Sequence, residues 1–146
     1  MAEHKFLDDT TLQTILTTEL NSLANGGRVL SAAWNNDIEL DILADVELVV
    51  GFAVAPAVGA LIELYLLPSV DDVNYPVGDT SNDPQAVLRV GFFEVRIAQT
   101  GVQLLAIPRI LLCPRNQKFL VKNVAGQAFA ATSNTLKIKP YKYQSL

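Results

Sequence analysis

The side chains that could act as nucleophiles or bases in this chain are few and lie far apart in the sequence. The single histidine, His4, lies four residues before Asp8, and the single cysteine is Cys113. A catalytic triad needs a base held in fixed geometry beside a nucleophile, and we expect residues 1–9 to form a mobile arm that cannot hold one. Cys113 is expected to be a small buried hydrophobic residue. The sequence has no GxSxG, Walker A, GxGxxG or HExxH motif, so we predict no enzymatic activity and no cofactor.

Carboxylates are the other groups that could do chemistry, and many of them fall in residues 68–85. This segment contains Asp71, Asp72, Asn74, Asp79, Asn82 and Asp83. Oxygen-rich loops can bind calcium, but the DxDxDG spacing is missing, and we predict no metal site. A solvated loop, or a contact of Tyr75 with another protein, are the alternatives. A glycosidase-like pair would need two carboxylates facing each other across a cleft, whereas these acids lie along a strand and in loops.

The composition indicates one domain with ample material for a core. Half of the 146 residues are hydrophobic and 18% are charged, far from the disordered class. One cysteine excludes an internal disulfide and fits assembly in a reducing compartment. The N-terminus does not resemble a secretory signal. The uncharged run 48–62 is too short for a membrane span and contains Pro56 and Gly59, so we expect two strands joined by a turn.

The charges are distributed very unevenly along the chain. Residues 1–88 hold 14 of the 15 acids and two bases, whereas residues 89–146 hold nine bases and one acid. Such segregation can indicate a nucleic-acid surface, but the lysines alternate with apolar residues, as the surface charges of strands do. We therefore expect no nucleic-acid binding, and expect one face of a sheet to carry Lys118, Lys122, Lys137 and Lys139.

The elements that position these groups are predicted to be β-strands. In residues 38–50 every even-numbered residue is apolar, while the odd positions include Glu39, Asp41, Asp45 and Glu47. This is the period of a strand with one buried face. Between turn residues, further strands are predicted at 28–34, 60–67, 86–98, 102–112, 118–123, 128–132 and 135–141.

These strands predict an all-β fold: a two-sheet antiparallel β-sandwich that is jelly-roll-like, with a plain Greek-key sandwich as the alternative. Apolar residues at helical spacing from Leu12 to Leu23 predict a short N-terminal helix, which the many threonines could restrict to residues 18–24. We divide the chain into an arm with a partial helix, 1–17, and a single sandwich domain, 18–146. A jelly roll places its first and last strands side by side, which would bring the acids of 38–50 close to Lys137 and Lys139.

Most aromatic residues are expected to be structural. Trp34 is predicted to fill space in the core or between the sheets, and the strand positions of Phe92, Phe93, Phe119 and Phe129 predict burial. No surface of alternating aromatic and basic residues is then left for single-stranded nucleic acid. Tyr141 and Tyr143, with Lys139 and Lys142, are instead expected to cover a neighbouring subunit.

Three stretches carry a resemblance to a known class of protein. They read ELNSLANG at 19–26, IELYLLPSVD at 62–71 with Asn74 and Tyr75 after it, and FLVKNVAGQAFAATSNTLKIKPY at 119–141. Together they resemble small β-rich virion proteins of tailed bacteriophages, in particular capsid cement or decoration proteins. The resemblance covers about residues 18–143 and includes no catalytic motif.

The resemblance implies a structural protein on the outside of a virion capsid, assembled in the host cytoplasm. Its implied partners are the major capsid protein and further copies of this chain, as a homotrimer rather than a homodimer, with no membrane, nucleic acid or small-molecule substrate. Such a protein would stabilise the shell by mass action, because it binds the assembled form. The resemblance transfers no individual residues; the partner-binding residues we expect are Lys5, Phe6, Leu7, Tyr75, Lys139, Tyr141 and Tyr143.

Two other functional classes stay open at this point. A carbohydrate-binding or tail-appendage module would need a platform of exposed aromatic side chains, for which Trp34, Tyr65 and Tyr75 are the candidates. An enzyme would need a cleft that collects carboxylates from distant strands.

Overall fold

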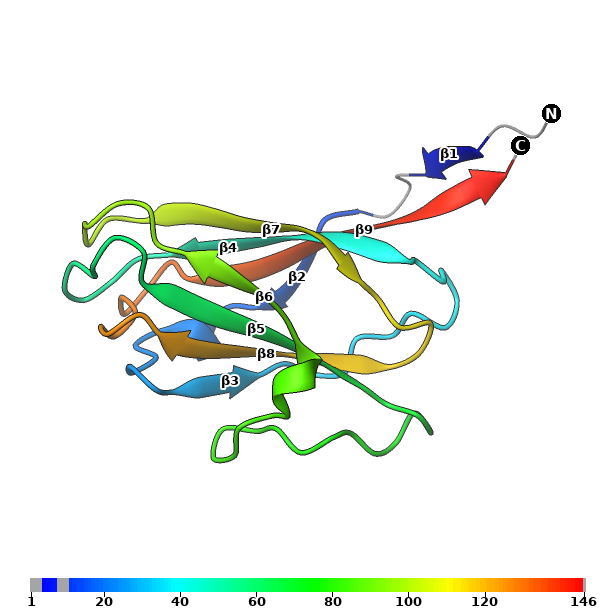
Figure 1. Cartoon of the computed structure of the whole chain (residues 1–146), viewed down its shortest axis with the longest axis horizontal. Helices are drawn as coiled ribbons and strands as arrows, with labels where there is room; N and C mark the ends of the chain where they lie inside the picture. Colours follow the sequence, from blue (N-terminus) through cyan, green and yellow to red (C-terminus); the bar gives the residue numbers. More distant parts are fainter. Residues whose placement is uncertain (1–3, 8–10, 146) are drawn as a thin grey trace.

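The computed structural model describes residues 4–7 and 11–145, and within them it contains nine strands and two short 3-10 helices (Figure 1). The strands are β1 (His4–Leu7), β2 (Gln13–Leu16), β3 (Arg28–Leu30), β4 (Leu43–Val50), β5 (Leu61–Pro68), β6 (Arg89–Glu94), β7 (Gln103–Leu111), β8 (Gln117–Val124) and β9 (Thr135–Ser145). The helices are η1 (Thr18–Leu20) and η2 (Ala86–Leu88).

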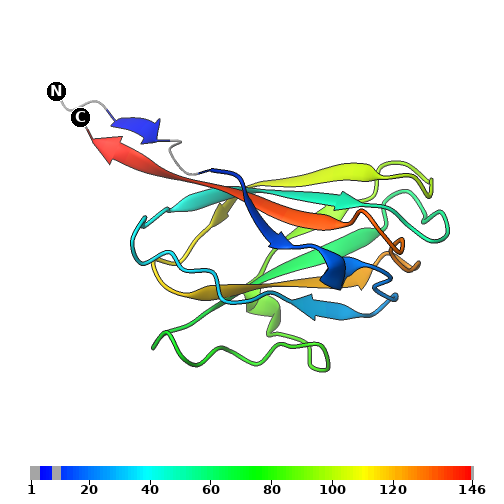
Figure 2. The ribbon, with the colours of Figure 1, turned by 180° about the vertical axis from the view of Figure 1, so that it is seen from behind.

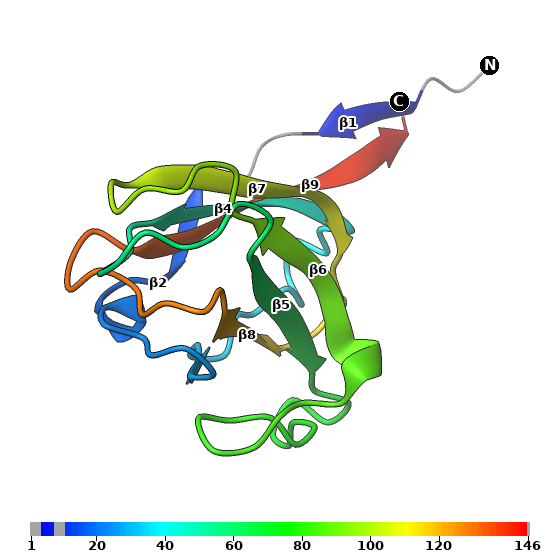
Figure 3. The same ribbon diagram turned by 60° about the vertical axis from the view of Figure 1, so that its left-hand side comes forward.

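Two antiparallel sheets face each other, as Figures 1 and 3 show. One sheet has β9, β4 and β7 in that order, with β1 and β2 both paired to β9; the other has the order β3-β8-β5-β6. When the strands are numbered with β2 as strand 1 and β9 as strand 8, the first sheet has the order 1-8-3-6 and the second sheet has the order 2-7-4-5. This order is jelly-roll connectivity. The predicted jelly-roll-like β-sandwich is therefore confirmed.

The core lies between the sheets, and strand alternation fills it. In β4 the even-numbered residues Ala44, Val46, Leu48 and Val50 are buried, while Asp45 on the other face is exposed. The same period of two appears in β7, where Leu105 and Ile107 point inward. The largest fully buried side chains in this core include Phe93, Phe119, Ile62 and Leu64 from the opposite sheet, Leu136 and Ile138 from β9, and Phe129 from a loop.

The predicted neighbourhood of β4 and β9 is confirmed. Asp45 lies opposite Lys139 and Glu47 lies opposite Lys137 in the antiparallel register. Glu39, which lies before β4, forms an ion pair with Lys142 at 3.3 Å. The acids and lysines that are far apart in the sequence therefore share one surface. The reason differs from the predicted one, because β4 is the third strand of the jelly-roll order and the first strand, β2, pairs with β9 separately.

The predicted strand over 38–50 begins later than its alternation indicates. Ile38 is 84% exposed, and Leu40 adopts a left-handed φ of 53°. The reason is Asn36, which is buried and whose side chain accepts a hydrogen bond from the Asp41 backbone N–H at 2.9 Å and donates to the Asp41 carbonyl at 2.7 Å. This clamp closes residues 36–41 into a loop, because it satisfies backbone groups that a strand would pair with a neighbour.

The predicted N-terminal helix over 12–23 is wrong except for one turn. Residues 13–16 form β2, which pairs with the start of β9, and η1 adds only three helical residues within the narrower 18–24 range. Pairing with β9 and burial of Leu16 favour the strand, where β-branched threonines also fit better. Part of the expected arm is likewise a strand, since β1 pairs with the end of β9.

Three other predicted strands are shorter or absent. The strand expected at 28–34 ends at Leu30, although Trp34 still makes an isolated bridge to Gln117. The one expected at 86–98 is η2 followed by β6. Residues 128–132 contain only a bridge between Phe129 and Phe52.

The sandwich has two different ends (Figures 1 and 2). Loops 20–27, 51–60, 95–102 and 125–134 meet at one end. At the other end, β1 and the last part of β9 project from the body as a two-stranded ribbon, which we call the terminal ribbon (residues 4–7 and 142–145).

Candidate functional site

Six of the seven expected partner-binding residues lie on β1 and β9. Lys5, Phe6 and Leu7 belong to β1, and the antiparallel register places Phe6 opposite Tyr143 and Leu7 opposite Lys142. Tyr141 and Lys139 lie on β9 with Tyr143, closer to the body of the sheet. The structure thus brings together residues from opposite ends of the sequence.

Three aromatic rings form the centre of this surface. The Phe6 ring lies 4.6 Å from the Tyr143 ring and 5.7 Å from the Tyr141 ring, the latter edge to face. Such pairs add about 0.5 to 1.5 kcal/mol beyond the area they bury. Phe6 nevertheless remains 61% exposed and Tyr143 remains 51% exposed. Large aromatic side chains left this open are typical of binding surfaces.

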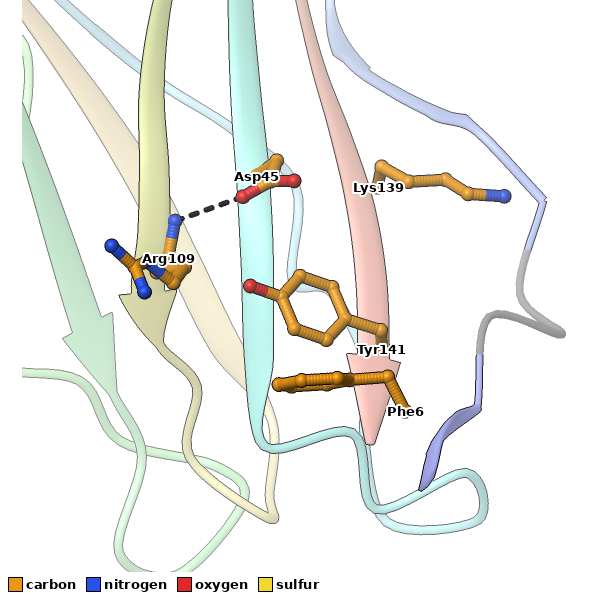
Figure 4. A pocket seen from close by; sticks show the side chains of 5 residues that line it. All are labelled: Phe6, Asp45, Arg109, Lys139 and Tyr141. Carbon is orange, nitrogen blue, oxygen red and sulfur yellow. Dashed lines mark hydrogen bonds between the residues drawn. The ribbon is translucent and has the colours of Figure 1, made fainter. Parts of the chain in front are cut away.

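A pocket of about 360 Å³ lies where the ribbon meets the sheet (Figure 4). Its lining comes from four strands: Phe6 on β1, Asp45 on β4, Arg109 on β7, and Lys139 and Tyr141 on β9. Burial, and secondarily the negative charge of Asp45, raise the pKa of the Tyr141 phenol. A phenol is already protonated at neutral pH, and the raised pKa keeps this hydroxyl a hydrogen-bond donor at more alkaline pH as well.

Asp45 and Arg109 owe their positions to a β-bulge. Ala44 pairs with Ile110 and Val46 pairs with Ile107, so two residues, Pro108 and Arg109, lie opposite Asp45. Arg109 takes a left-handed φ of 56°, and its backbone N–H donates to the Asp45 carboxylate at 2.9 Å. A bulge at this edge strand turns a side chain towards the surface and interrupts the ladder.

Tyr75, the seventh expected residue, lies apart from the others on the opposite sheet. Its ring is half-buried and lies 4.3 Å from the Lys118 ammonium, a cation–π contact within the chain. The ring therefore contacts the chain's own β8.

The loop that carries Tyr75 lies on the outer face of its own sheet. Asp83 pairs with Arg28 of β3 at 2.5 Å and with Lys122 of β8 at 2.8 Å. Gly78 lies so close to Leu67 that a Cβ added there would be 2.9 Å from the leucine methyl. Beneath the loop a second small core contains Tyr65, Leu67 and Leu120, with Leu30 and Leu88 against it. The loop is therefore long because it packs across the outer face of this sheet and covers the second small core.

Two carboxylates of this loop, Asp71 and Asp79, bind the loop's own backbone. Asp71 accepts hydrogen bonds from the Asn74 backbone and side chain at 2.7 Å and from the Val73 backbone at 3.0 Å, which holds its pKa well below the usual range. Asp79 is held in the same way by Ser81 and Asn82, and its pKa is also lowered. These are turn-forming contacts. Among the described residues, no group of three or more His, Cys, Asp or Glu side chains is placed to hold a metal ion.

Neither Cys113 nor His4 is among the residues that line the pocket. Cys113 is half-buried rather than fully buried as expected, and burial raises its pKa, which disfavours the reactive thiolate. His4 lies in β1. The basic residues expected on one face are divided between the sheets, with Lys118 and Lys122 on β8 and the other two on β9.

The aromatic platform considered for carbohydrate binding is not assembled by its candidates. Trp34 packs edge to face on Phe119 and donates its indole N–H to Gln13 at 2.6 Å, as expected of a filler. Tyr65 is 5% exposed, and its hydroxyl donates to Glu63 at 2.7 Å. Phe92, expected to be buried, is 40% exposed beneath the Arg89 guanidinium.

Sequence reasoning missed Asp45 and Arg109 as pocket residues. The available signal was Pro108 followed by Arg109, which interrupts the apolar alternation of β7, since proline inside a strand indicates an edge or a bulge. In the part of the chain that the structure covers, no helix is long and apolar enough to cross a bilayer. No protein-family model, curated protein or solved structure matches this chain.

Proposed function

We propose that this chain is a structural virion protein of the capsid decoration, or cement, class. It binds the outer surface of a phage capsid and stabilises the shell by contacting more than one capsid subunit, without catalysis. The observation that carries this proposal is the terminal ribbon, which projects from the sandwich body (Figure 2). It carries the exposed rings of Phe6 and Tyr143.

The ribbon has the properties of a segment that needs a partner. A two-stranded ribbon is marginally stable by itself, and unpaired strand edges attract further strands. Among the described residues, β9 pairs with β4 only up to Tyr141, so the part of β9 beyond it pairs with β1 alone. Binding to a shell would cover both the open edges and the aromatic rings.

The pocket at the base of the ribbon adds a second contact of mixed chemistry. The residues that line it carry both signs of charge, from Asp45, Arg109 and Lys139, besides the Tyr141 ring. Both signs at one apolar site favour a protein surface as the ligand, because each charge can be matched by a complementary side chain. The proposed partners are the major capsid protein and further copies of this chain, arranged as a trimer rather than as a dimer, on the exterior of a virion assembled in the host cytoplasm.

Co-sedimentation with expanded phage heads that lack this protein tests the proposal. Wild-type chain should pellet with the heads, and Phe6→Ala combined with Tyr143→Ala should reduce binding about tenfold or more. Phe92→Ala, an exposed phenylalanine on β6, is the matched control and should bind as the wild type does. A folded wild-type chain that stays in the supernatant would overturn the capsid function, and a glycan array then tests the carbohydrate-binding alternative.

A further inference from the structure

The end of the sandwich opposite the ribbon is a single surface built from four loops. The backbone N–H of Phe52 donates to Thr100 at 3.1 Å, that of Ala53 to Ala128 at 2.9 Å, and that of Ser22 to Ala130 at 3.0 Å. These bonds tie loop 51–60 to loops 95–102 and 125–134, and the last of these to loop 20–27. We call this surface the loop end.

The loop end is almost free of charge. Residues 20–27, 51–60, 97–102 and 125–134 contain no Asp, Glu, Lys or Arg, although 18% of the whole chain is charged. At that average, about six charged residues would be expected in these segments. Arg96, at the margin, is already paired with Glu94 at 3.0 Å.

Apolar side chains occupy this surface instead. Val54, Val58, Ile97 and Val102 are each between 54% and 63% exposed, and Leu104 at the start of β7 is 65% exposed. Single exposed valines need no explanation, but several of them gathered on one neutral surface are typical of a protein contact.

Two buried asparagines hold the loops in place. Asn134 accepts from the Gly51 N–H at 3.0 Å and donates to Asn21 at 2.9 Å and to the Ala130 carbonyl at 2.7 Å. Asn123 donates to the carbonyls of Leu23 and Gln127 at 2.9 and 2.8 Å. A surface fixed in this way loses little conformational entropy when a partner covers it.

The charge distribution favours a second copy of this chain as the partner. Nucleic acid and anionic membranes are bound by lysine and arginine, which these loop segments lack. Copies of this chain carry a net charge of -4 and repel one another on average. Contact among the loop ends of several copies places no like charges together, and such a neutral surface suits a closed symmetric assembly.

We propose that copies of this chain associate through the loop end, with each terminal ribbon pointing away from the contact. The proposed association is argued from the loop end alone. Its consequence, that an oligomer presents several ribbons to a capsid shell, rests on the proposed capsid function. Linking ribbons in this way would raise their combined affinity without any new contact.

Sedimentation velocity of the purified full chain over micromolar to millimolar concentrations tests this inference. The wild type should sediment as an oligomer, and Val58→Asp and Ile97→Asp should each shift it towards the 15.9 kDa monomer, weakening association about tenfold or more. Val87→Asp adds the same charge at an 82% exposed valine on η2 and should leave association unchanged. If either aspartate variant fails to fold by circular dichroism, Val58→Thr keeps the side-chain shape and should still weaken association.

Two results would overturn the inference. One is a wild-type chain that stays monomeric throughout, and the other is an oligomer that the loop-end variants leave unchanged. Failure of the capsid proposal is distinguishable, because heads that take up no wild-type chain leave the sedimentation result standing. Conversely, a monomeric chain that still pellets with heads would retain the ribbon contact and reject the loop-end contact.

Discussion

The Asp45 carboxylate accepts a hydrogen bond from the backbone N–H of Arg109 at 2.9 Å, across the β4–β7 pair. This bond satisfies a backbone donor that the bulge removes from the strand ladder. It also holds Arg109 in a left-handed conformation that a non-glycine residue seldom adopts. A single acid on β4 therefore helps to shape both the edge of the sheet and the pocket.

Asp45→Ala should destabilise the fold by about 1 kcal/mol, because the Arg109 N–H loses its acceptor at a partly solvated site. Asp45→Asn keeps an oxygen acceptor and should cost less than half as much. Urea unfolding of the three proteins measures the difference. Equal losses for Asn and Ala would mean that the charge, and not the hydrogen bond, matters at this position.

The adjacent residues Phe92 and Phe93 test the alternation of β6. Phe93 is fully buried between the sheets, whereas Phe92 is 40% exposed. Phe93→Ala should lower the free energy of unfolding by about 3 to 5 kcal/mol through lost burial and the cavity left behind. Phe92→Ala should cost about 1 kcal/mol or less. Chemical denaturation decides, and a reversed order would reject the inward direction of Phe93.

Gly78 provides a test of the loop that covers β5 and β8. A Cβ at this position would lie 2.8 Å from the Pro84 Cβ and 2.9 Å from the Leu67 methyl, so Gly78→Ala should destabilise by about 1 to 3 kcal/mol. Gly101→Ala is the control, because only the Gln99 side chain lies within 4 Å of the added carbon. Thermal unfolding of both variants shows whether the loop is packed as closely as these distances require.

Asp83 should make stability depend on pH. Hydrogen bonds from Arg28, and then from Lys122, hold the pKa of this carboxyl well below its usual range. The unfolded chain, with an ordinary aspartate pKa of about 3.9, therefore takes up the proton first. The contribution of Asp83 is fully present above that pKa and is lost as pH falls towards the folded value.

Urea midpoints measured from neutral pH down to acid conditions should fall more steeply for the wild type than for Asp83→Asn. Removing both partners, with Arg28→Gln and Lys122→Gln, should flatten the curve in the same way. High salt should reduce the difference, because the site is exposed to solvent. A wild-type slope that survives in both variants would assign the acid sensitivity to other carboxylates.

The sequence predicts the jelly roll well because its strong signals are local. Alternation in 38–50 and the turn residues between strands specify two-sided strands, and the opposite charges of β4 and β9 agree with their pairing. The errors fall where distant contacts decide. The hydrogen bonds of Asn36 close residues 36–41 into a loop although residues 38–50 alternate perfectly. Residues 13–16 form a strand because they pair with β9, although their apolar spacing favours a helix.

The candidate site shows the same division. Phe6, Tyr141 and Tyr143 are expected from the sequence to bind a partner, and the fold brings their rings together. Asp45 and Arg109 could not be placed beside them without the register of β4 and β7. The loop end could not be predicted from the sequence either, because its neutral loops are far apart in the sequence and meet only in the folded jelly roll.

Deletion of residues 2–9 separates folding from binding. Of this segment the structure describes residues 4–7, which form β1 and pair with the end of β9, whereas the buried core residues between the sheets lie later in the chain. The shortened chain should therefore keep its cooperative unfolding transition, with a small change in the free energy of unfolding. It should lose most of its affinity for capsids, since Phe6 is removed and the β9 end is left unpaired. Co-sedimentation beside urea unfolding measures both properties, and undiminished capsid binding would show that β1 takes no part in the contact.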